Sequence, residues 1–360
     1  MSTNGRTTHG RHLAAITGIG PITRPAIGVK ELAEVATLGF TADELTATGG
    51  TLEIDAVDNF HPADFLGRRG WKFFPEPTRA ALAAVRLTLA DAKRHPDTLE
   101  PDERAATGAR TGVVVGTNFA VDAIVDRIDR ALLAEGIPGI SPVECPNFAV
   151  NVPAGQLAIA GGFKAFNVTL VDLMTAGYEA LLLAGRALAE GRADSVLAGT
   201  IEGPPPASAH TVTGPRADAF GACLFHLEPQ RSAAERRVVP YAYLAGGTRR
   251  MLPGDPQHAA RVLGSALDRL VGDAGADQVQ LCVPAGAPGA PVADAVHAWA
   301  AARGGDTTVS VVHGAPQATG TSALALGREL ARELRGTAVF GALGPQGNLT
   351  LLRLTADGGQ

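Results

Sequence analysis

One segment has the pattern most typical of a catalytic site. It spans residues 166 to 203 and reads FNVTLVDLMTAGYEALLLAGRALAEGRADSVLAGTIEG. It predicts a buried strand, an abrupt turn, a long apolar helix, a GRAD turn and a second strand. A turn from a buried strand into a helix N-terminus is where α/β enzymes present a nucleophile, because the helix dipole and its free N–H groups favour an anion. The residue at that turn is Met174, whose thioether cannot act as an acyl acceptor. The position is typical of an enzyme, but the reactive group is missing.

Two carboxylates, Asp172 and Glu179, flank Met174. For both we expect a structural role first, either polar satisfaction of a buried turn or a subunit contact. Cys223 and Cys282 fall in apolar strands and are expected to pack in the core. Cys145, in SPVECPNF, is predicted to lie in a loop core or at a subunit interface, with a role as substitute nucleophile as the weaker alternative.

The histidines, like the cysteines, divide into residues expected to be structural and one candidate site residue. His226 and His297 fall on strand and helix faces and are expected to be structural, whereas His313 is retained as a candidate pocket residue.

Composition excludes several classes of function. The 360 residues are 46% hydrophobic and 19% charged with a net charge of −5, which argues against disorder and against nucleic-acid or anionic-membrane partners. Apolar runs are too short for a transmembrane helix, and the polar start lacks a secretory signal. The cysteines lack CxxC spacing, and the GIG at 18–20 departs from a dinucleotide fingerprint at Thr23. We therefore expect a cytoplasmic protein with no metal and no cofactor.

The elements that position these residues follow an α/β rhythm. In the first half, strands are predicted at 13–22, 112–116, 168–173, 195–199 and 220–227, with helices at 77–92, 121–135 and 175–190. In the second half, strands are predicted at 238–244, 278–284, 308–312, 339–343 and 349–354, with helices at 256–273, 292–302 and 322–334. Each half is a series of strands and helices that ends in a pair of strands, which indicates an internal duplication. The halves are predicted at 1–232 and 233–360, with the seam, the junction between them, near 231–237.

The chain resembles the β-ketoacyl synthase family of the thiolase fold. The resemblance rests on ITGIG near the N-terminus, the segment at 60–92, GVVVGT at 112–117, the segment at 140–168 and the Gly-rich loop at 341–347. It implies a duplicated five-layer α-β-α-β-α fold. In that family a catalytic cysteine lies at the strand-to-helix turn, and the spacing to the GRAD turn places Met174 there.

The family's other catalytic positions are degenerate as well. Ala285 matches the first catalytic histidine, and Gly286 matches the glycine that follows it. Gly314 is the ungapped match to the second histidine, with His313 one residue out of step, and the family's lysine has no counterpart. Because condensation needs the cysteine and both histidines, the resemblance implies that this chain alone does not condense acyl units.

Among ketosynthase relatives, the chain-length factors of type II polyketide synthases lack the nucleophile and keep the fold. Such a protein forms a heterodimer with an active ketosynthase subunit, works with an acyl carrier protein and shapes the tunnel for the growing polyketide or polyene chain. The resemblance places the intersubunit strand at 166–173, and assigns the tunnel and interface to Phe119, Ala120, Val121, Ile124, Glu144 and Cys145.

Two alternatives stay open at this point. One is a diverged stand-alone enzyme that transfers acyl groups with His313 and a nucleophile such as Thr175. The other is a homodimeric scaffold that binds carrier protein, with Arg68 and Arg69 as candidate contacts.

Overall fold

The structure is a computed structural model that describes residues 12–39, 59–204, 220–284, 289–304, 307–314 and 319–357. Strands of the first half are β1 (Ala14–Thr23), β2 (Thr111–Gly116), β3 (Asn167–Leu170), β4 (Ser195–Glu202) and β5 (Gly221–Glu228). Its helices are α1 (Val29–Glu34), α3 (Pro62–Leu66), α4 (Glu76–Asp91), η1 (Pro96–Thr98), α5 (Pro101–Ala109), α6 (Asp122–Glu135), η2 (Ile137–Gly139), η3 (Cys145–Asn147), α7 (Val152–Gly161), α8 (Ala176–Ala189) and α9 (Gln230–Glu235).

The second half repeats this arrangement at smaller scale. Its strands are β6 (Ala242–Met251), β7 (Gln278–Pro284), β8 (Thr308–Gly314), β9 (Thr337–Leu343) and β10 (Asn348–Thr355). Its helices are α10 (Pro256–Val271), η5 (Gly272–Ala274), α11 (Ala290–Ala302) and α12 (Gly320–Ala331). The Asp255 side chain caps α10 by accepting a hydrogen bond from the His258 N–H at 2.8 Å.

The strand order shows the duplication directly. The strands form one continuous ladder in the order β3-β2-β4-β5-β1-β6-β10-β9-β7-β8. Each set of five strands has the same internal order when read outward from β1 or from β6. The fold is therefore a duplicated one, as expected, whereas the boundary at 232 and 233 remains a prediction.

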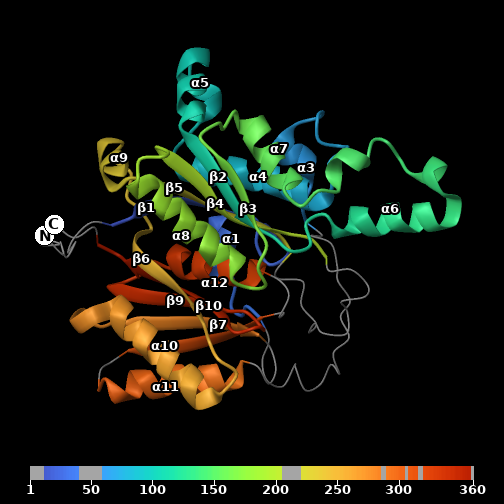
Figure 1. The fold of residues 1–360 in the computed structure, drawn as a ribbon. Coiled ribbons are helices and arrows are strands. Elements are labelled where there is room, and N and C mark those ends of the chain that lie inside the picture. Colours follow the sequence, from blue (N-terminus) through green and yellow to red (C-terminus); the bar gives the residue numbers. More distant parts are fainter. Residues whose placement is uncertain are drawn as a thin grey trace, which may run out of the picture.

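Five layers stack in Figure 1. Helices α4 and α7 cover the first-half strands, α8 and α12 lie in the middle, and α10 and α11 cover the second-half strands. Three apolar clusters fill the spaces between these layers, and the largest surrounds α8 and α12. This is the α-β-α-β-α architecture of the thiolase fold.

The GIG at 18–20 lies within β1, as the strand predicted at 13–22 implies, and a Cβ on Gly18 would lie 2.7 Å from the Cβ of Ala92. The glycine therefore lets α4 approach the sheet. The strand predicted at 238–244 begins at Ala242 and continues to Met251, because pairing with β10 outweighs the poor strand propensity of Gly246 and Gly247.

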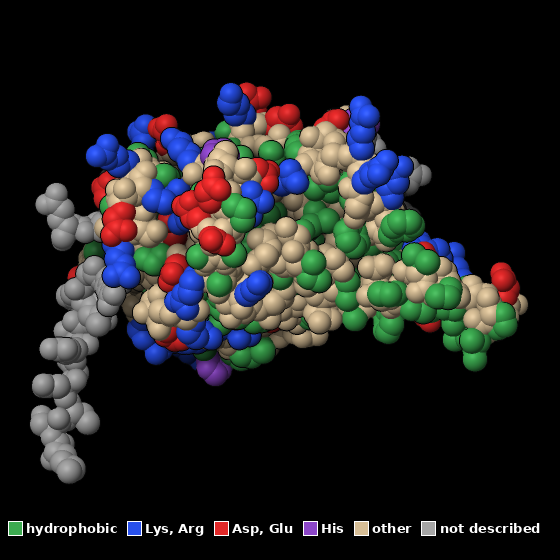
Figure 2. Space-filling view, turned by 90° about the horizontal axis from the view of Figure 1, so that it is seen from above, with side chains coloured by type: hydrophobic (Ala, Val, Ile, Leu, Met, Phe, Trp, Pro, Cys, Tyr) green, Lys and Arg blue, Asp and Glu red, His purple; other side chains and the backbone are tan. Residues whose placement is uncertain are grey.

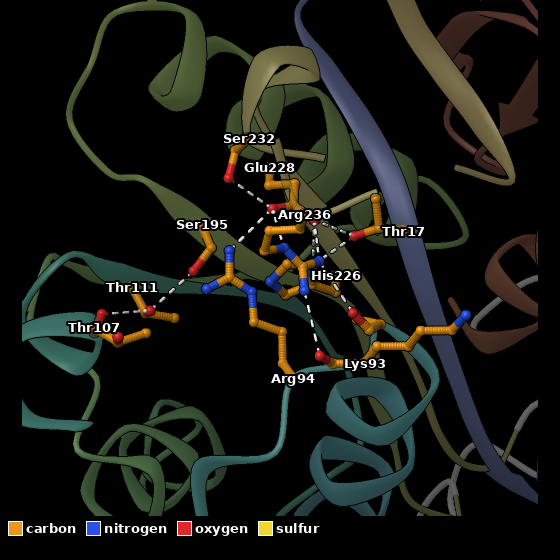
Figure 3. A network of polar contacts seen from close by, with 11 residues as sticks. Thr17, Lys93, Arg94, Thr107, Thr111, Ser195, His226, Glu228, Ser232 and Arg236 are labelled. Carbon is orange, nitrogen blue, oxygen red and sulfur yellow. Dashed lines mark hydrogen bonds and ion pairs between the residues drawn. The ribbon is translucent and has the colours of Figure 1, made fainter. Parts of the chain in front are cut away.

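A buried ionic network ties β1, α4 and β5 together (Figure 3). Glu228 accepts hydrogen bonds from Arg94 at 2.9 Å, Arg236 at 2.6 Å and the Thr17 hydroxyl at 2.9 Å. The single Thr17 hydroxyl proton goes to Glu228, so the 2.7 Å contact to His226 makes Nδ1 of His226 the donor. Burial, with the charges of Arg94 and Arg236, lowers the pKa of His226 to about 3, although Glu228 opposes this.

We predict that His226→Asn reduces the sensitivity of folding to acid. The unfolded chain protonates this histidine near pH 6.5 and the folded chain only near pH 3, so folding loses stability as the pH falls through that window. Asparagine keeps a donor near the Nδ1 position but does not titrate. The free energy of unfolding, measured in urea at pH 7.5 and pH 5, should fall less in the variant. An equal fall in both proteins would contradict the assignment.

Candidate functional site

The predicted strand-to-helix turn is present, and Met174 lies at its apex. β3 ends at Leu170, α8 begins at Ala176, and Met174 between them has a φ of 59°. A left-handed backbone at a residue with a long side chain is uncommon and costs on the order of 1–3 kcal/mol, and such positions cluster at functional sites. Met174 is 0% exposed. The backbone therefore keeps the form of a nucleophile turn around a side chain that cannot react.

The Met174 side chain fills the space between the two halves. Its carbonyl oxygen accepts a hydrogen bond from the Ser322 hydroxyl at 3.0 Å, which fixes the turn against α12. A Cβ on Gly314, at the end of β8, would lie 3.1 Å from the Met174 Cε. Any larger residue at 314 would press on Met174, so the two residues fit one another sterically. The position expected to match a catalytic histidine is thus closed by packing.

Asp172 and Glu179 satisfy the polar groups around the turn, as expected. Asn348 donates to Asp172 at 2.6 Å and to the Thr175 hydroxyl at 3.0 Å. Thr175 donates in turn to Glu179 at 3.3 Å. Burial raises the pKa of Glu179, and the charge of Arg249 opposes that rise. Because Thr175 is fully buried and its hydroxyl is bonded on both sides, the geometry does not favour it as a nucleophile.

The other positions that the resemblance matches to catalytic residues lie beside or within gaps in the described part of the chain. His313 is part of β8 and half-buried; its Nδ1 has no hydrogen-bond partner within the described residues, and burial lowers its pKa. Ala285 and Gly286 lie outside the described residues. Whether His313 lines a pocket therefore stays a prediction. Of the predicted loop at 341–347, residues 341–343 belong to β9, and only residues 344–347 connect β9 to β10, which begins with Asn348 beside Asp172.

Sequence reasoning missed Glu202, a buried carboxylate at the end of β4. It accepts backbone hydrogen bonds from Asn118 at 3.1 Å, Phe119 at 2.6 Å and Thr319 at 3.1 Å. Burial raises its pKa to about 7, and these bonds limit the rise. Glu202 therefore joins the loop before α6 to the start of α12, beside the Met174 turn. A lone glutamate closing the apolar strand SVLAGTIE was the available signal.

Three of the predicted tunnel and interface residues line one cavity. Ala120, Ile124 and Glu144 border a space of 630 Å³ between α6, the segment at 72–79 and the segment at 141–147. Glu144 is held there by an ion pair with Arg127 at 2.6 Å. Phe119 and Val121 lie on the adjoining turn into α6, and Cys145 begins η3. The tunnel assignment of these residues remains a prediction.

The first half carries a strand edge that is unpaired within the described residues, and several exposed apolar side chains. β3 is the terminal strand of the sheet and is only partly buried. Two exposed side chains lie beside it: Val171 directly follows β3, and Ile159 is on α7, which packs against β3. Others are exposed on α6 and in the segment after it: Leu133, Ile137, Val143 and Phe148. Figure 2 shows hydrophobic side chains gathered on the arm at the right of the molecule, which Figure 1 identifies as α6 and the connection that follows it. Exposed apolar surface of this extent marks an interaction site.

The other cysteines behave as predicted. Cys223 and Cys282 are buried in the core, and burial raises the pKa of the Cys282 thiol to about 12. Within the described ranges, no three His, Cys, Asp or Glu side chains are grouped to hold a metal ion. None of the described helices is both long and apolar enough to cross a bilayer.

Comparison with known sequences supports one family. The family model described as "Beta-ketoacyl synthase, N-terminal domain" matches residues 38–215. The chain is similar to 3-oxoacyl-[acyl-carrier-protein] synthase 2 of Vibrio cholerae, with 33% identity over 29% of this chain and 25% of that protein. Its counterpart in Synechocystis is 28% identical over 51% of this chain and 38% of that protein. These alignments thus span about a quarter to two-fifths of the relatives' lengths.

Comparison with solved structures covers nearly the whole chain. "The ishigamide ketosynthase/chain length factor" has 24% identity and a TM-score of 0.69, over 95% of this chain and 99% of that chain. A "type II PKS acyl-carrier protein in complex with its ketosynthase bound to the hexaketide" has 18% identity and a TM-score of 0.71, over 96% and 100%. The family model thus matches residues 38–215, and the solved structures share the duplicated five-layer fold over nearly the whole chain, so the chain is similar to the β-ketoacyl synthases in both sequence and fold.

Proposed function

We propose that this chain is a non-catalytic chain-length factor that forms a heterodimer with an active ketosynthase and shapes the acyl tunnel for a polyketide or polyene chain. The observation that carries the proposal is the strained strand-to-helix turn occupied by a fully buried methionine, which packs against Gly314. The resemblance matches these two positions to the catalytic cysteine and the second catalytic histidine. A protein that keeps the layered fold without the reactive groups serves through its surface and its cavities.

The edge of β3 supports assembly with a partner. An unpaired strand edge offers backbone donors and acceptors to a second chain. The exposed side chains of Ile159 and Val171 beside this edge add apolar area that a partner would bury. One solved structure similar to this chain is described as a ketosynthase/chain length factor, which favours a ketosynthase as the partner.

Co-expression with a ketosynthase tests the assembly. The native mass of the purified material should correspond to a one-to-one complex. A homodimer of this chain that does not take up the ketosynthase would overturn the proposal. The acyl carrier protein is the second proposed partner, and its binding to the complex should be measurable in the same purification.

Phe119 is predicted to limit the length of the product. It lies where the loop held by Glu202 enters α6, next to the cavity bordered by Ala120 and Ile124. Phe119→Ala keeps the backbone hydrogen bond to Glu202 and removes a large apolar group. Because an overfilled channel costs on the order of 1–3 kcal/mol, the variant complex should make longer chains, detected by mass spectrometry of the products.

Val239→Ala provides the matched control. Val239 lies between α9 and β6, is 88% exposed and does not border the cavity. This control should leave the product lengths unchanged. An unchanged product profile in Phe119→Ala would count against Phe119 as a tunnel wall.

A further inference from the structure

A cleft lies beneath η1 and α5. It is at the amino ends of strands β2 and β4, whereas Met174 lies beyond the carboxyl end of β3. The floor of the cleft is formed by Thr111 and Ser195, which begin the parallel strands β2 and β4. Two adjoining cavities, an inner one of 260 Å³ and an outer one of 530 Å³, share Arg94, His95 and Arg104 as lining residues. The two spaces therefore adjoin, and Arg94 and Arg104 border both of them.

The inner cavity is positively charged. Among the described residues, its walls carry four cations and a single carboxylate: Lys93, Arg94, Arg104, Arg236 and Glu103. Glu228 lies behind this wall; burial would raise its pKa, but the hydrogen bond from Arg236 and the nearby positive charges lower it to about 2. One ionised carboxylate thus faces both Arg94 and Arg236, which leaves an excess of positive charge toward the cleft.

Arg94 has unused hydrogen-bonding capacity in this cavity. One of its terminal nitrogens donates to Glu228 at 2.9 Å. Its Nε–H is buried and finds no acceptor within the described residues. Figure 3 shows its guanidinium between the Ser195–Thr111 hydroxyl pair and the cluster around Glu228. A buried guanidinium N–H without a partner costs free energy. An anion in the cavity would meet the part of the Arg94 side chain that stays exposed, about a quarter of its surface, rather than this closed-off N–H.

The outer cavity is apolar along one wall. The side chains of Leu82, Val85 and Leu89 on α4 line it, together with Trp71, Phe74 and Leu157. Its volume lies within the range of small-molecule sites. An apolar channel that leads to a cationic end suits a ligand with an apolar body and an anionic head.

We propose that this cleft binds a medium-chain carboxylate, with its head at Arg94 and Arg104 and its chain along α4. The carboxylate accepts charge-assisted hydrogen bonds from the guanidinium groups, and the chain displaces water from Leu82, Val85 and Leu89. This site is remote from the Met174 turn and does not depend on the proposed tunnel function.

Trp71 provides a local reporter for binding. The chain has two tryptophans, and the other, Trp299, lies on α11 in the second half. The Trp299→Phe variant of the 360-residue chain therefore emits from Trp71 alone. We expect ω-bromoundecanoate to quench this emission saturably, because bromine quenches tryptophan on contact. The corresponding bromo-alcohol should need at least a tenfold higher concentration, because it lacks the anionic head.

Arg104 supplies the decisive variant. It is exposed and borders both cavities, whereas Arg94 also holds Glu228. Arg104→Gln, made in the Trp299→Phe background, should raise the half-saturating carboxylate concentration about tenfold, the loss of one charge-assisted hydrogen bond. The control Arg261→Gln, at an exposed position on α10, should leave it unchanged. Absence of saturable quenching, equal quenching by the alcohol, or no effect of Arg104→Gln would overturn the proposal.

Discussion

Thr169→Pro is expected to abolish assembly with a ketosynthase while the chain itself remains folded. Phe166 and Leu170 turn their carbonyls toward β2, where they accept from Val113 and Thr117 at 3.0 Å. The two-residue period of a strand therefore turns the backbone groups of Thr169 outward, to the free edge of β3. Proline removes the outward N–H without removing a bond to β2.

The loss should exceed about tenfold in affinity, since a backbone hydrogen bond disappears at the centre of the proposed interface and the ring obstructs the approach of the partner strand. Co-purification and native mass measure it, and circular dichroism checks that the fold is retained. Thr169→Ala keeps the N–H and should assemble normally. Undiminished assembly of Thr169→Pro would show that the partner binds elsewhere.

Met174→Ala is expected to destabilise the fold without impairing condensation by the assembled complex. Met174 is 0% exposed and packs against Gly314 and the start of α12. Truncating a fully buried methionine leaves a cavity and costs about 2–5 kcal/mol in the free energy of unfolding. Urea denaturation measures this loss, and condensation is then compared at a temperature at which both complexes remain folded.

Met174→Leu keeps most of the volume and should cost less than about 1.5 kcal/mol. The pair of variants separates a packing role from a chemical one, because a catalytic group would affect turnover more than stability. Loss of condensation in Met174→Ala, at unchanged stability, would contradict the assignment of Met174 as a packing residue.

Local periodicity predicted most of the layered fold. The apolar runs at 195–199 and 220–227 correspond to β4 and β5, which pair as expected, in antiparallel orientation. The turn at Met174 was predictable because a buried strand runs directly into a long apolar helix. By contrast, α5 and α7 were missed, and the proposed seam at 231–237 largely coincides with the short helix α9.

The polar interior was much harder to predict, because its contacts join residues far apart in the chain. Arg94 and Glu228 are 134 positions apart, and Glu202 meets Thr319 across 117 positions. No local pattern pairs such residues, since their proximity follows from the order of strands in the sheet. The fit between Met174 and Gly314 likewise depends on the packing of β3 against α8 and of β8 against α12.

The most direct test of the account compares condensation by this chain, by its ketosynthase partner and by the complex of the two. Each sample receives acyl-loaded and malonyl-loaded carrier protein, and elongated products are measured by mass spectrometry. We predict that this chain alone elongates nothing, that the complex elongates to a defined length, and that replacing the partner's nucleophile abolishes all turnover. Elongation by this chain alone, or by a complex whose partner lacks its nucleophile, would contradict the account.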